Sequence, residues 1–394
     1  MRSVIVHYQE IALKGRNRPW FIERLTQNLR TATADLDVQE VRTLAGRIEL
    51  VLGPSAEWEQ VKARLSTVFG IANFSQAGQT APDLDALGEA ILRDLGDRSP
   101  RSFRVSARRA DKRFPMTSPA IEAAIGGRVK AATGWQVDLS DPEFVIRVEM
   151  LHDRAFYAFG RERGAGGLPT GVSGRVACLM SGGIDSPVAA WRMMRRGCRV
   201  QLIHFHSYPL VSDVSQEKAR NLARVLARYQ LKLRLHLVPF GDVQKQVILT
   251  VPAPLRVVIY RRLMLRIAER LARRGKSRAL VTGEAIGQVA SQTLDNLVVI
   301  GSVATMPIFR PLIGMDKDEV VAEAQRIGTY PISIVPDEDC CQLFTPRNPV
   351  TRATAATVDA AESSLSIDSL IQMAVDGTVM EEYRYPMVQS AARS

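Results

Sequence analysis

The spacing of hydrophobic and polar residues changes character along this 394-residue chain. In the first part, short stretches of alternating hydrophobic residues are interspersed with helices that have one apolar face, which predicts small α+β units. The strands expected there are residues 3–9, 46–53, 102–110, 143–151 and 154–163, and the helices are residues 19–36, 57–69, 83–95 and 118–134.

A glycine-rich joint separates this part from the rest. Residues 164–174 hold 5 glycines in 11 positions, which is typical of a linker or hinge. Beyond the joint, strands expected at residues 176–180, 199–207, 233–240, 278–284 and 307–314 alternate with helices expected at residues 186–197, 215–230, 261–275 and 316–328. This order favours a parallel sheet with helices on both faces, and ligands bind such sheets at the carboxyl ends of the strands.

The length of the chain allows two or three domains. We predict an amino-terminal unit over residues 1–60, a second unit over residues 61–166, a linker over residues 167–175 and a carboxyl-terminal domain over residues 176–394. The fold class is therefore a multidomain combination of α+β and α/β.

Basic residues outnumber acidic ones, and the formal net charge is +11. They gather in two regions: residues 187–280 hold 20 Lys and Arg against 4 Asp and Glu, and residues 101–113 hold 6 against 1. Two basic regions would suit an extended phosphate backbone. The alternative, that these side chains coat solvated helix faces, stays open at this stage.

Four cysteines, Cys178, Cys198, Cys340 and Cys341, are too few for a disulfide-built secreted scaffold. The first residues lack the apolar stretch of a signal peptide, and no run of about 18 apolar residues could span a bilayer. We therefore expect a soluble, cytoplasmic protein with no membrane partner.

The first strand of the α/β region ends in Ser181-Gly182-Gly183-Ile184-Asp185-Ser186, directly before a helix. The glycines let the backbone approach an anion, Ser186 can cap the helix, and the helix start favours phosphate. No Walker lysine follows, which favours a grip on a leaving pyrophosphate over γ-phosphoryl transfer. Asp185 would repel phosphates, so we expect it to hold Mg²⁺ or a water bound to Mg²⁺. A purely structural tight turn is the alternative.

The SGGIDS loop after a strand resembles the PP-loop ATP pyrophosphatases, which adenylate a carbonyl oxygen and release pyrophosphate. Further stretches are similar to one group within them. These are EIALKGRNR (10–18), RSFRVSARRADKRFP (101–115), TGEAIGQVASQTLDN (282–296), RPLIGMDKDE (310–319) and IGTYPISIVPDEDCCQLFTP (327–346). Together they resemble the tRNA 4-thiouridine synthetases of the ThiI family, in the form without a rhodanese domain.

This resemblance implies a ferredoxin-like unit, a THUMP domain and a PP-loop domain, the last with an adenine nucleotide alpha hydrolase-like sheet. It implies that ATP and Mg²⁺ serve to adenylate the C4 oxygen of uridine 8 in tRNA, after which a cysteine persulfide replaces that oxygen with sulfur. A cysteine desulfurase or another persulfide donor is the implied partner. A ThiS-like sulfur carrier, a role in thiamine thiazole synthesis and a homodimer stay open.

The resemblance also implies which residues form the sites. The ATP-binding residues would be Leu179, Met180, Ser181, Gly182, Gly183, Asp185, Ser186, His204, Phe205, Arg261, Gly283 and Gln292. The tRNA-binding residues would be Lys14, Arg16, Arg18, Arg104, Arg108, Arg109, Lys112 and Arg113.

Physical reasons agree with several of these assignments. The guanidinium of Arg261 suits a phosphate, although surface solvation would also explain it. Gly283 would let the adenine pass close to the backbone. His204 and His206 lie two positions apart on one strand and could form a metal pair, but no third ligand is apparent.

The adjacent thiols of Cys340 and Cys341 pose a separate question. Consecutive Cα atoms lie about 3.8 Å apart, closer than most disulfides allow, and zinc would need more ligands. Cysteines buried in a core strand remain an alternative. A thiol near an adenylated carbonyl can carry sulfur as a persulfide, and relatives with one cysteine here read D-x-C, which matches Cys341. Candidate resolving cysteines are Cys340, Cys178 and Cys198.

Two other functions stay open from the sequence. A different PP-loop enzyme could modify another tRNA position, or the chain could be an RNA-binding adaptor without catalysis. The intact SGGIDS loop and Cys341 argue against the adaptor.

Overall fold

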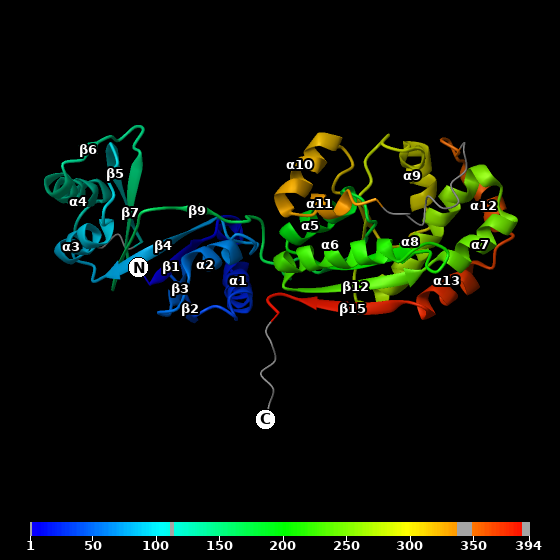
Figure 1. The fold of residues 1–394 in the computed structure, drawn as a ribbon, viewed down its shortest axis with the longest axis horizontal. Coiled ribbons are helices and arrows are strands. Elements are labelled where there is room, and N and C mark those ends of the chain that lie inside the picture. The colour runs from blue at the N-terminus through cyan, green and yellow to red at the C-terminus, as the bar shows by residue number, and fades with distance from the viewer. Residues whose placement is uncertain (1, 111–113, 337–348, 388–394) are drawn as a thin grey trace, which may run out of the picture. The chain divides into compact units, whose positions relative to one another are not determined.

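The computed structural model describes residues 2–110, 114–336 and 349–387 of the chain, which form two compact units that meet at Pro169 and Thr170 (Figure 1). Lys112, Arg113, Cys340 and Cys341 lie outside the described residues. The predicted combination of an α+β part and an α/β part is confirmed. The exact domain limits stay a prediction.

Unit 1 is built on a nine-stranded sheet in the order β2-β3-β1-β4-β8-β7-β5-β6, with β9 pairing to β4. Its strands are β1 (Ser3–His7), β2 (Val38–Leu44), β3 (Arg47–Leu52), β4 (Asn73–Thr80), β5 (Ser102–Arg109), β6 (Gln136–Val137), β7 (Phe144–Met150), β8 (Ala155–Ala158) and β9 (Glu162–Arg163). Its α-helices are α1 (Arg18–Ala32), α2 (Trp58–Leu65), α3 (Leu84–Leu95) and α4 (Ser118–Thr133), and η1 (Glu10–Leu13) and η2 (Gly15–Asn17) are 3₁₀ turns.

Strand β4 joins the two halves of unit 1. Its first residues pair with β9, its last residues pair with β8, and β1 runs along it from Asn73 to Ala77. The amino-terminal half and the following half therefore share one strand, and their hydrogen bonds form one continuous sheet.

Unit 2 holds a six-stranded sheet in the order β14-β13-β10-β11-β12-β15. Its strands are β10 (Arg175–Leu179), β11 (Arg199–His206), β12 (Lys232–Pro239), β13 (Leu280–Val281), β14 (Ile308–Phe309) and β15 (Val379–Arg384). Its helices are α5 (Asp185–Arg195), α6 (Val214–Gln230), α7 (Gly241–Thr250), α8 (Arg256–Arg274), α9 (Leu294–Gly301), α10 (Lys317–Ile327), α11 (Tyr330–Ser333), α12 (Ala355–Glu362) and α13 (Ile367–Asp376), with 3₁₀ turns η3 (Ala253–Leu255) and η4 (Ala290–Gln292).

The connections of unit 2 explain where a ligand can bind. All its neighbouring strands run parallel except β15, which pairs antiparallel to β12. The chain moves from β10 through β11 to β12 and then returns by α8 to β13 on the other side of β10. Because such crossovers are right-handed, this return places α8 on the opposite face from α5 and α6. The strand order thus reverses between β10 and β13, where open α/β sheets bind ligands.

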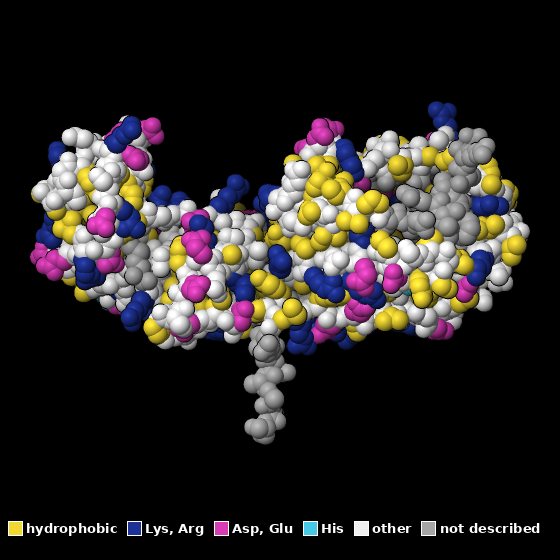
Figure 2. Space-filling model, in the orientation of Figure 1, with side chains coloured by type: hydrophobic (Ala, Val, Ile, Leu, Met, Phe, Trp, Pro, Cys, Tyr) yellow, Lys and Arg dark blue, Asp and Glu magenta, His cyan; other side chains and the backbone are white. Residues whose placement is uncertain are grey.

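Helix α8 lies at the centre of a hydrophobic core of unit 2. Its buried side chains, among them Ile259, Tyr260 and Leu263, belong to one cluster with the sheet and with α13. The basic residues of α8 therefore occupy only part of its surface, as a helix with one apolar face requires. On the face shown in Figure 2, Lys and Arg side chains are scattered among acidic ones over both units. No helix in the described parts of the chain is both long and apolar enough to cross a membrane.

Candidate nucleotide site and arginine cavity

The loop after β10 has the close-packed form that its glycines predict. The backbone amide of Ser181 donates to Ser186 Oγ at 3.0 Å, and the amide of Gly183 donates to Ser181 Oγ at 3.3 Å. Helix α5 begins at Asp185 with Ile184 at its N-cap and no side-chain cap. Ser186 therefore does not cap the helix, contrary to our expectation: its buried hydroxyl ties the two ends of the loop together. The amide groups that begin α5 have no side-chain cap, which suits an anion at the helix start.

A cavity of about 180 Å³, which we call the nucleotide cavity, lies beside this loop, at the switch point between β10 and β13. The residues that line it are Leu179, Met180, Ser181, Asp185, Ser186, Phe205, Arg261, Met264, Thr282, Gly283, Glu284 and Gln292. The structure thus brings together nine of the twelve predicted ATP-binding residues in one cavity. Gly182 and Gly183 belong to the adjoining loop, and His204 lies behind the wall, where its Nδ1 is 2.9 Å from the Met180 carbonyl oxygen.

Gly283 lies close to the backbone of the loop, which is a second reason for its small size. A Cβ atom added there would lie 2.8 Å from the amide nitrogen of Ser186 and 2.9 Å from the carbonyl carbon of Asp185. The residue after β13 therefore packs directly on the backbone of the loop, and any side chain would push the loop away. The approach of adenine to Gly283 stays a prediction.

Gly283→Ala is expected to lower kcat/KM for ATP by about 100-fold, because a shift of about 1 Å in groups that position a substrate has that effect. The change should leave the unit folded, since overpacking by one methyl costs about 1–3 kcal/mol. The measurement is nucleotide-dependent activity together with thermal unfolding. Gly314→Ala is the matched control, because nothing lies within 4 Å of a Cβ there. Equal activity of both variants would contradict this role of Gly283.

Asp185 is held by two side chains that the sequence interpretation did not single out. Lys317 Nζ lies 2.7 Å from Asp185 Oδ1, and Gln288 Nε2 donates to Asp185 Oδ2 at 3.0 Å. Both residues lie in stretches that carry the resemblance, RPLIGMDKDE and TGEAIGQVASQTLDN. The resemblance therefore included them but predicted no role for either. Lys317 begins α10 and brings a mobile cation to the edge of the predicted phosphate site.

A magnesium ion shared with a nucleotide stays a prediction for Asp185, whose two oxygens contact Lys317 and Gln288 in this structure. No group of three or more His, Cys, Asp or Glu side chains gathers anywhere within residues 2–110, 114–336 and 349–387. Mg²⁺ usually keeps several waters and binds one or two carboxylates together with substrate phosphates. One carboxylate beside a phosphate loop is such a set.

Arg261 is not a solvated surface cation, which answers the alternative that we left open. Its guanidinium pairs with the buried carboxylate of Glu284, and its Nη1 donates to Ser291 Oγ at 3.0 Å. The other oxygen of Glu284 accepts from Arg310 Nε at 2.6 Å and from Thr282 Oγ1 at 2.8 Å. Burial opposes the charge of Glu284, but Arg261 and Arg310 outweigh it and hold its pKa below the ordinary value. Two arginines around one carboxylate leave this wall with a net positive charge.

The histidines on β11 do not form a metal site in the described structure. Burial, with a smaller effect of His204 and Arg220, lowers the pKa of His206 to about 4. His206 is therefore neutral at physiological pH and belongs to the core.

Two of the proposed resolving cysteines are buried. Cys178 has no exposed surface, and burial raises its pKa to about 12. Burial also raises the pKa of Cys198, with Arg196 opposing it. Because the thiolate is the reactive form, both positions disfavour thiol exchange.

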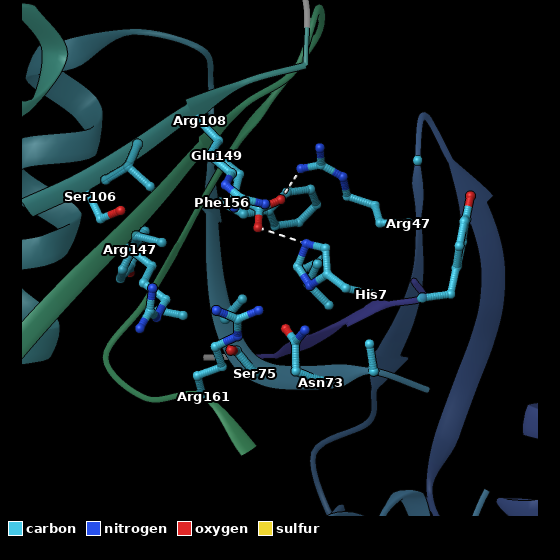
Figure 3. Close-up of a pocket in the computed structure, with 18 of the residues that line it drawn as sticks. His7, Arg47, Asn73, Ser75, Ser106, Arg108, Arg147, Glu149, Phe156 and Arg161 are labelled. Carbon is cyan, nitrogen blue, oxygen red and sulfur yellow. Dashed lines mark hydrogen bonds and ion pairs between the residues drawn. The ribbon is translucent and has the colours of Figure 1, made fainter. Parts of the chain in front are cut away.

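Unit 1 contains a second cavity, of about 670 Å³, that we call the arginine cavity (Figure 3). The residues that line it are Ile5, His7, Tyr8, Gln9, Gly46, Arg47, Ala72, Asn73, Ser75, Ala77, Arg104, Ser106, Arg108, Arg147, Val148, Glu149, Phe156, Tyr157, Ala158 and Arg161. The five arginines come from both halves of the unit, and Glu149 is the one carboxylate among these lining residues.

Glu149 organises one wall of the arginine cavity. One of its oxygens lies 2.8 Å from His7 Nε2, and the other pairs with Arg47 (Figure 3). Burial opposes its charge, but the bond from His7 and the charges of Arg47 and Arg108 hold the pKa of Glu149 below its usual range. Two residues earlier on β7, burial lowers the pKa of Arg147 first, and the nearby arginines lower it further. Concentrated positive charge of this kind favours a bound anion.

The predicted tRNA-binding residues divide into three groups. Arg104 and Arg108 line the arginine cavity. The side chain of Arg109 is not among the lining residues and donates instead to the backbone carbonyl oxygens of Phe114 and Met116.

The remaining three described residues of that set lie near η1 and η2. Lys14 lies over the ring of Phe21, Arg18 lies over the ring of Tyr8, and Arg16 is exposed. The sequence interpretation missed His7, Arg47, Arg147, Glu149 and Arg161. His7 and Arg47 are far from the other three in sequence, and the pairing of the strands brings them together.

The fold and the cavity at its switch point define a nucleotide-binding α/β domain attached to a smaller strand-rich unit, and comparisons with known proteins specify the family. Three family models match successive segments: the ThiI ferredoxin-like domain over residues 3–75, the THUMP domain over residues 79–156, and "Thiamine biosynthesis protein (ThiI)" over residues 171–367. The chain belongs to the ThiI family.

Individual relatives agree with this assignment over the whole chain. A probable tRNA sulfurtransferase of Thermus thermophilus is 50% identical over 384 residues, which covers 96% of this chain and 93% of that protein. A probable tRNA sulfurtransferase of Moorella thermoacetica is 44% identical and covers 94% of both chains. A crystal structure of a 4-thiouridine synthetase in complex with RNA and ATP has a TM-score of 0.89 and 36% identity, and covers 98% of this chain and 100% of that one.

Proposed function

We propose that this chain is an ATP-dependent tRNA sulfurtransferase that makes 4-thiouridine at position 8 of tRNA. The observation that carries the proposal is the cavity in which the SGGIDS loop, Asp185 and Arg261 meet at the switch point of the parallel sheet. Its support from relatives is the match over nearly the whole chain to proteins named tRNA sulfurtransferase and to the ATP-bound 4-thiouridine synthetase.

In the first step, the C4 oxygen of uridine attacks the α-phosphate of ATP and pyrophosphate leaves. The amide groups at the start of α5 and the guanidinium of Arg261 hold the phosphates, and Lys317 offsets the charge that develops on them. Asp185 would hold Mg²⁺, which neutralises charge on the leaving pyrophosphate when it is bound. Glu284 keeps the side chain of Arg261 in place.

In the second step, the terminal sulfur of a Cys341 persulfide attacks C4 and AMP leaves. The product is a C4–S–S–Cys341 linkage. A second thiol attacks the Cys341 sulfur, the S–S bond breaks, and the reduced sulfur stays on the base while that thiol forms a disulfide with Cys341. The persulfide itself must come from a cysteine desulfurase or another donor, and a sulfur carrier of the ThiS type would be a second acceptor if the chain also serves thiamine synthesis.

One assay separates this function from the alternatives. The full chain is incubated with tRNA, ATP, Mg²⁺, a cysteine desulfurase and ³⁵S-labelled cysteine, and the labelled nucleoside is then identified and located. We expect 4-thiouridine at position 8. A thionucleoside elsewhere would favour a different PP-loop enzyme, and tight tRNA binding with no thionucleoside would favour an adaptor.

The arginine cavity gives a separate prediction for tRNA binding. Arg108→Ala should weaken tRNA binding and reduce the slope of log Kd against log salt by about 1, because each phosphate contact contributes about that much. Binding is measured by filter retention over a range of salt concentrations. Arg93→Ala is the matched control, since Arg93 lies in the same unit, 72% exposed, outside the cavity. An equal effect of the two changes would mean that only net charge matters.

A further inference from the structure

The proposed reaction requires the target base to leave its place in the RNA. A base inside a folded RNA is stacked on its neighbours, and enzymes that modify one base commonly move it into their own pocket. Such a base loses its stacking, and an aromatic side chain can replace it. The following inference rests on the proposed function and concerns which ring does this.

Tyr208 is an exposed aromatic residue at the edge of the sheet where the nucleotide cavity lies. Strand β11 ends at His206, and Tyr208 follows two residues later with 54% of its surface exposed. Phe205, three residues before it, lines the nucleotide cavity, so about 10 Å of chain at most separates the two residues. Within the described parts of the chain, the ring and the hydroxyl of Tyr208 have no hydrogen-bond or ring partner.

The backbone that carries Tyr208 is fixed on both sides. Ser207 is fully buried, and its hydroxyl donates to the side chain of Gln244 on α7. The amide of Leu210 donates to the Ser207 carbonyl at 2.7 Å, and Leu210 lies over Gly241, where α7 begins. An exposed ring on an anchored turn is prepared to bind, because ordering the backbone costs no further free energy at that moment.

Phe309 provides a contrast at the same edge. It ends β14 and is 44% exposed, so it resembles Tyr208 in type and exposure. The next residue, Arg310, sends its side chain to Glu284 in the cavity wall. Because successive residues of a strand point to opposite faces, the ring of Phe309 points away from that wall.

We infer that the ring of Tyr208 stacks on the target uracil after the base has left the RNA stack, and so positions its C4 oxygen near the nucleotide cavity. Tyr208 is then a substrate-positioning residue that acts on the RNA and not on ATP.

The test compares Tyr208→Ala, Tyr208→Phe and Phe309→Ala in the full chain with the unchanged protein. Stacking on one base contributes roughly 5- to 150-fold by alanine substitution. We expect a loss of that size in kcat/KM for tRNA with Tyr208→Ala, near-normal activity with Tyr208→Phe, and no change with Phe309→Ala. The affinity for ATP, measured by calorimetry, should be the same in all four proteins.

A second readout follows the base itself. With 2-aminopurine placed next to the target uridine, the fluorescence increase on binding should be seen with the unchanged protein and with Tyr208→Phe, and be lost with Tyr208→Ala. Full activity of Tyr208→Ala, or an equal loss in Tyr208→Phe, would overturn the inference. A change in self-association of Tyr208→Ala in sedimentation would assign the ring to a protein interface instead. Absence of any thionucleoside with the unchanged protein would overturn the proposed function itself.

Discussion

Asp185→Ala is expected to reduce tRNA adenylation by about 100- to 1000-fold, the effect of removing one preorganised electrostatic contact to a transition state. The side chain proposed to hold Mg²⁺ would be lost, and Lys317 and Gln288 would lose their shared partner. The measurement is tRNA-dependent release of pyrophosphate. The affinity for ATP without Mg²⁺ should not fall, because the change removes a negative charge beside the phosphate loop and frees the ammonium group of Lys317 to bind phosphate.

Two controls define this result. Asp318→Asn removes an exposed carboxylate one residue from Lys317 and should leave the rate unchanged. A double-mutant cycle with Lys317→Ala then measures the coupling of the pair, because effects of residues in contact are not additive. If Asp185→Ala kept its normal rate of pyrophosphate release, the magnesium assignment would be wrong.

Cys341→Ser is expected to abolish sulfur transfer while tRNA-dependent pyrophosphate release continues. A serine hydroxyl cannot carry a persulfide, whereas none of the described residues that line the nucleotide cavity is a cysteine, so adenylation should continue as before. The two products, pyrophosphate and labelled 4-thiouridine, are measured in the same reaction. Normal thiolation by Cys341→Ser would remove it as the sulfur carrier.

The other three cysteines allow a matched set of controls. Cys178 and Cys198 are buried with raised pKa, so Cys178→Ala and Cys198→Ala should keep both activities apart from effects on stability. If Cys340 is the thiol that attacks the linkage to Cys341, Cys340→Ser should stop at the C4–S–S–Cys341 linkage and release no 4-thiouridine. Release of 4-thiouridine by Cys340→Ser would assign this attack to another thiol.

The sequence predicted the nucleotide site better than the cavity in unit 1, for a physical reason. Phosphate loops are local: the glycines, the acidic residue and the helix start are contiguous, so a short motif contains most of the geometry. The arginine cavity forms only when separate strands pair in one sheet, and no local sequence pattern predicts that pairing. Its arginines, His7 and Glu149 come from β1, β3, β5, β7 and the segment after β8. Arg104 and Arg108 were found because they lie in a charged run, whereas Arg147 stands alone in an apolar strand.

Some local expectations were wrong because tertiary contacts decide the role of small side chains. Ser186 had the right type and place for a helix cap, but its hydroxyl faces back into the loop. For Gly283 the approach of adenine stays a prediction, and the structure adds a close contact with the backbone of α5 that no local pattern shows. Strand β15 was not predicted, because its residues are mostly polar and exposed and it is defined by pairing with β12.

The strand that both halves of unit 1 share determines how the protein can be divided. The family models for the ferredoxin-like and THUMP domains meet between residues 75 and 79, inside β4. A fragment cut there would expose the unpaired backbone N–H and C=O groups of two sheet edges, and such edges promote aggregation. The two sequence modules thus form one folding unit, and a fragment intended to bind RNA independently should end near Pro169 and include both.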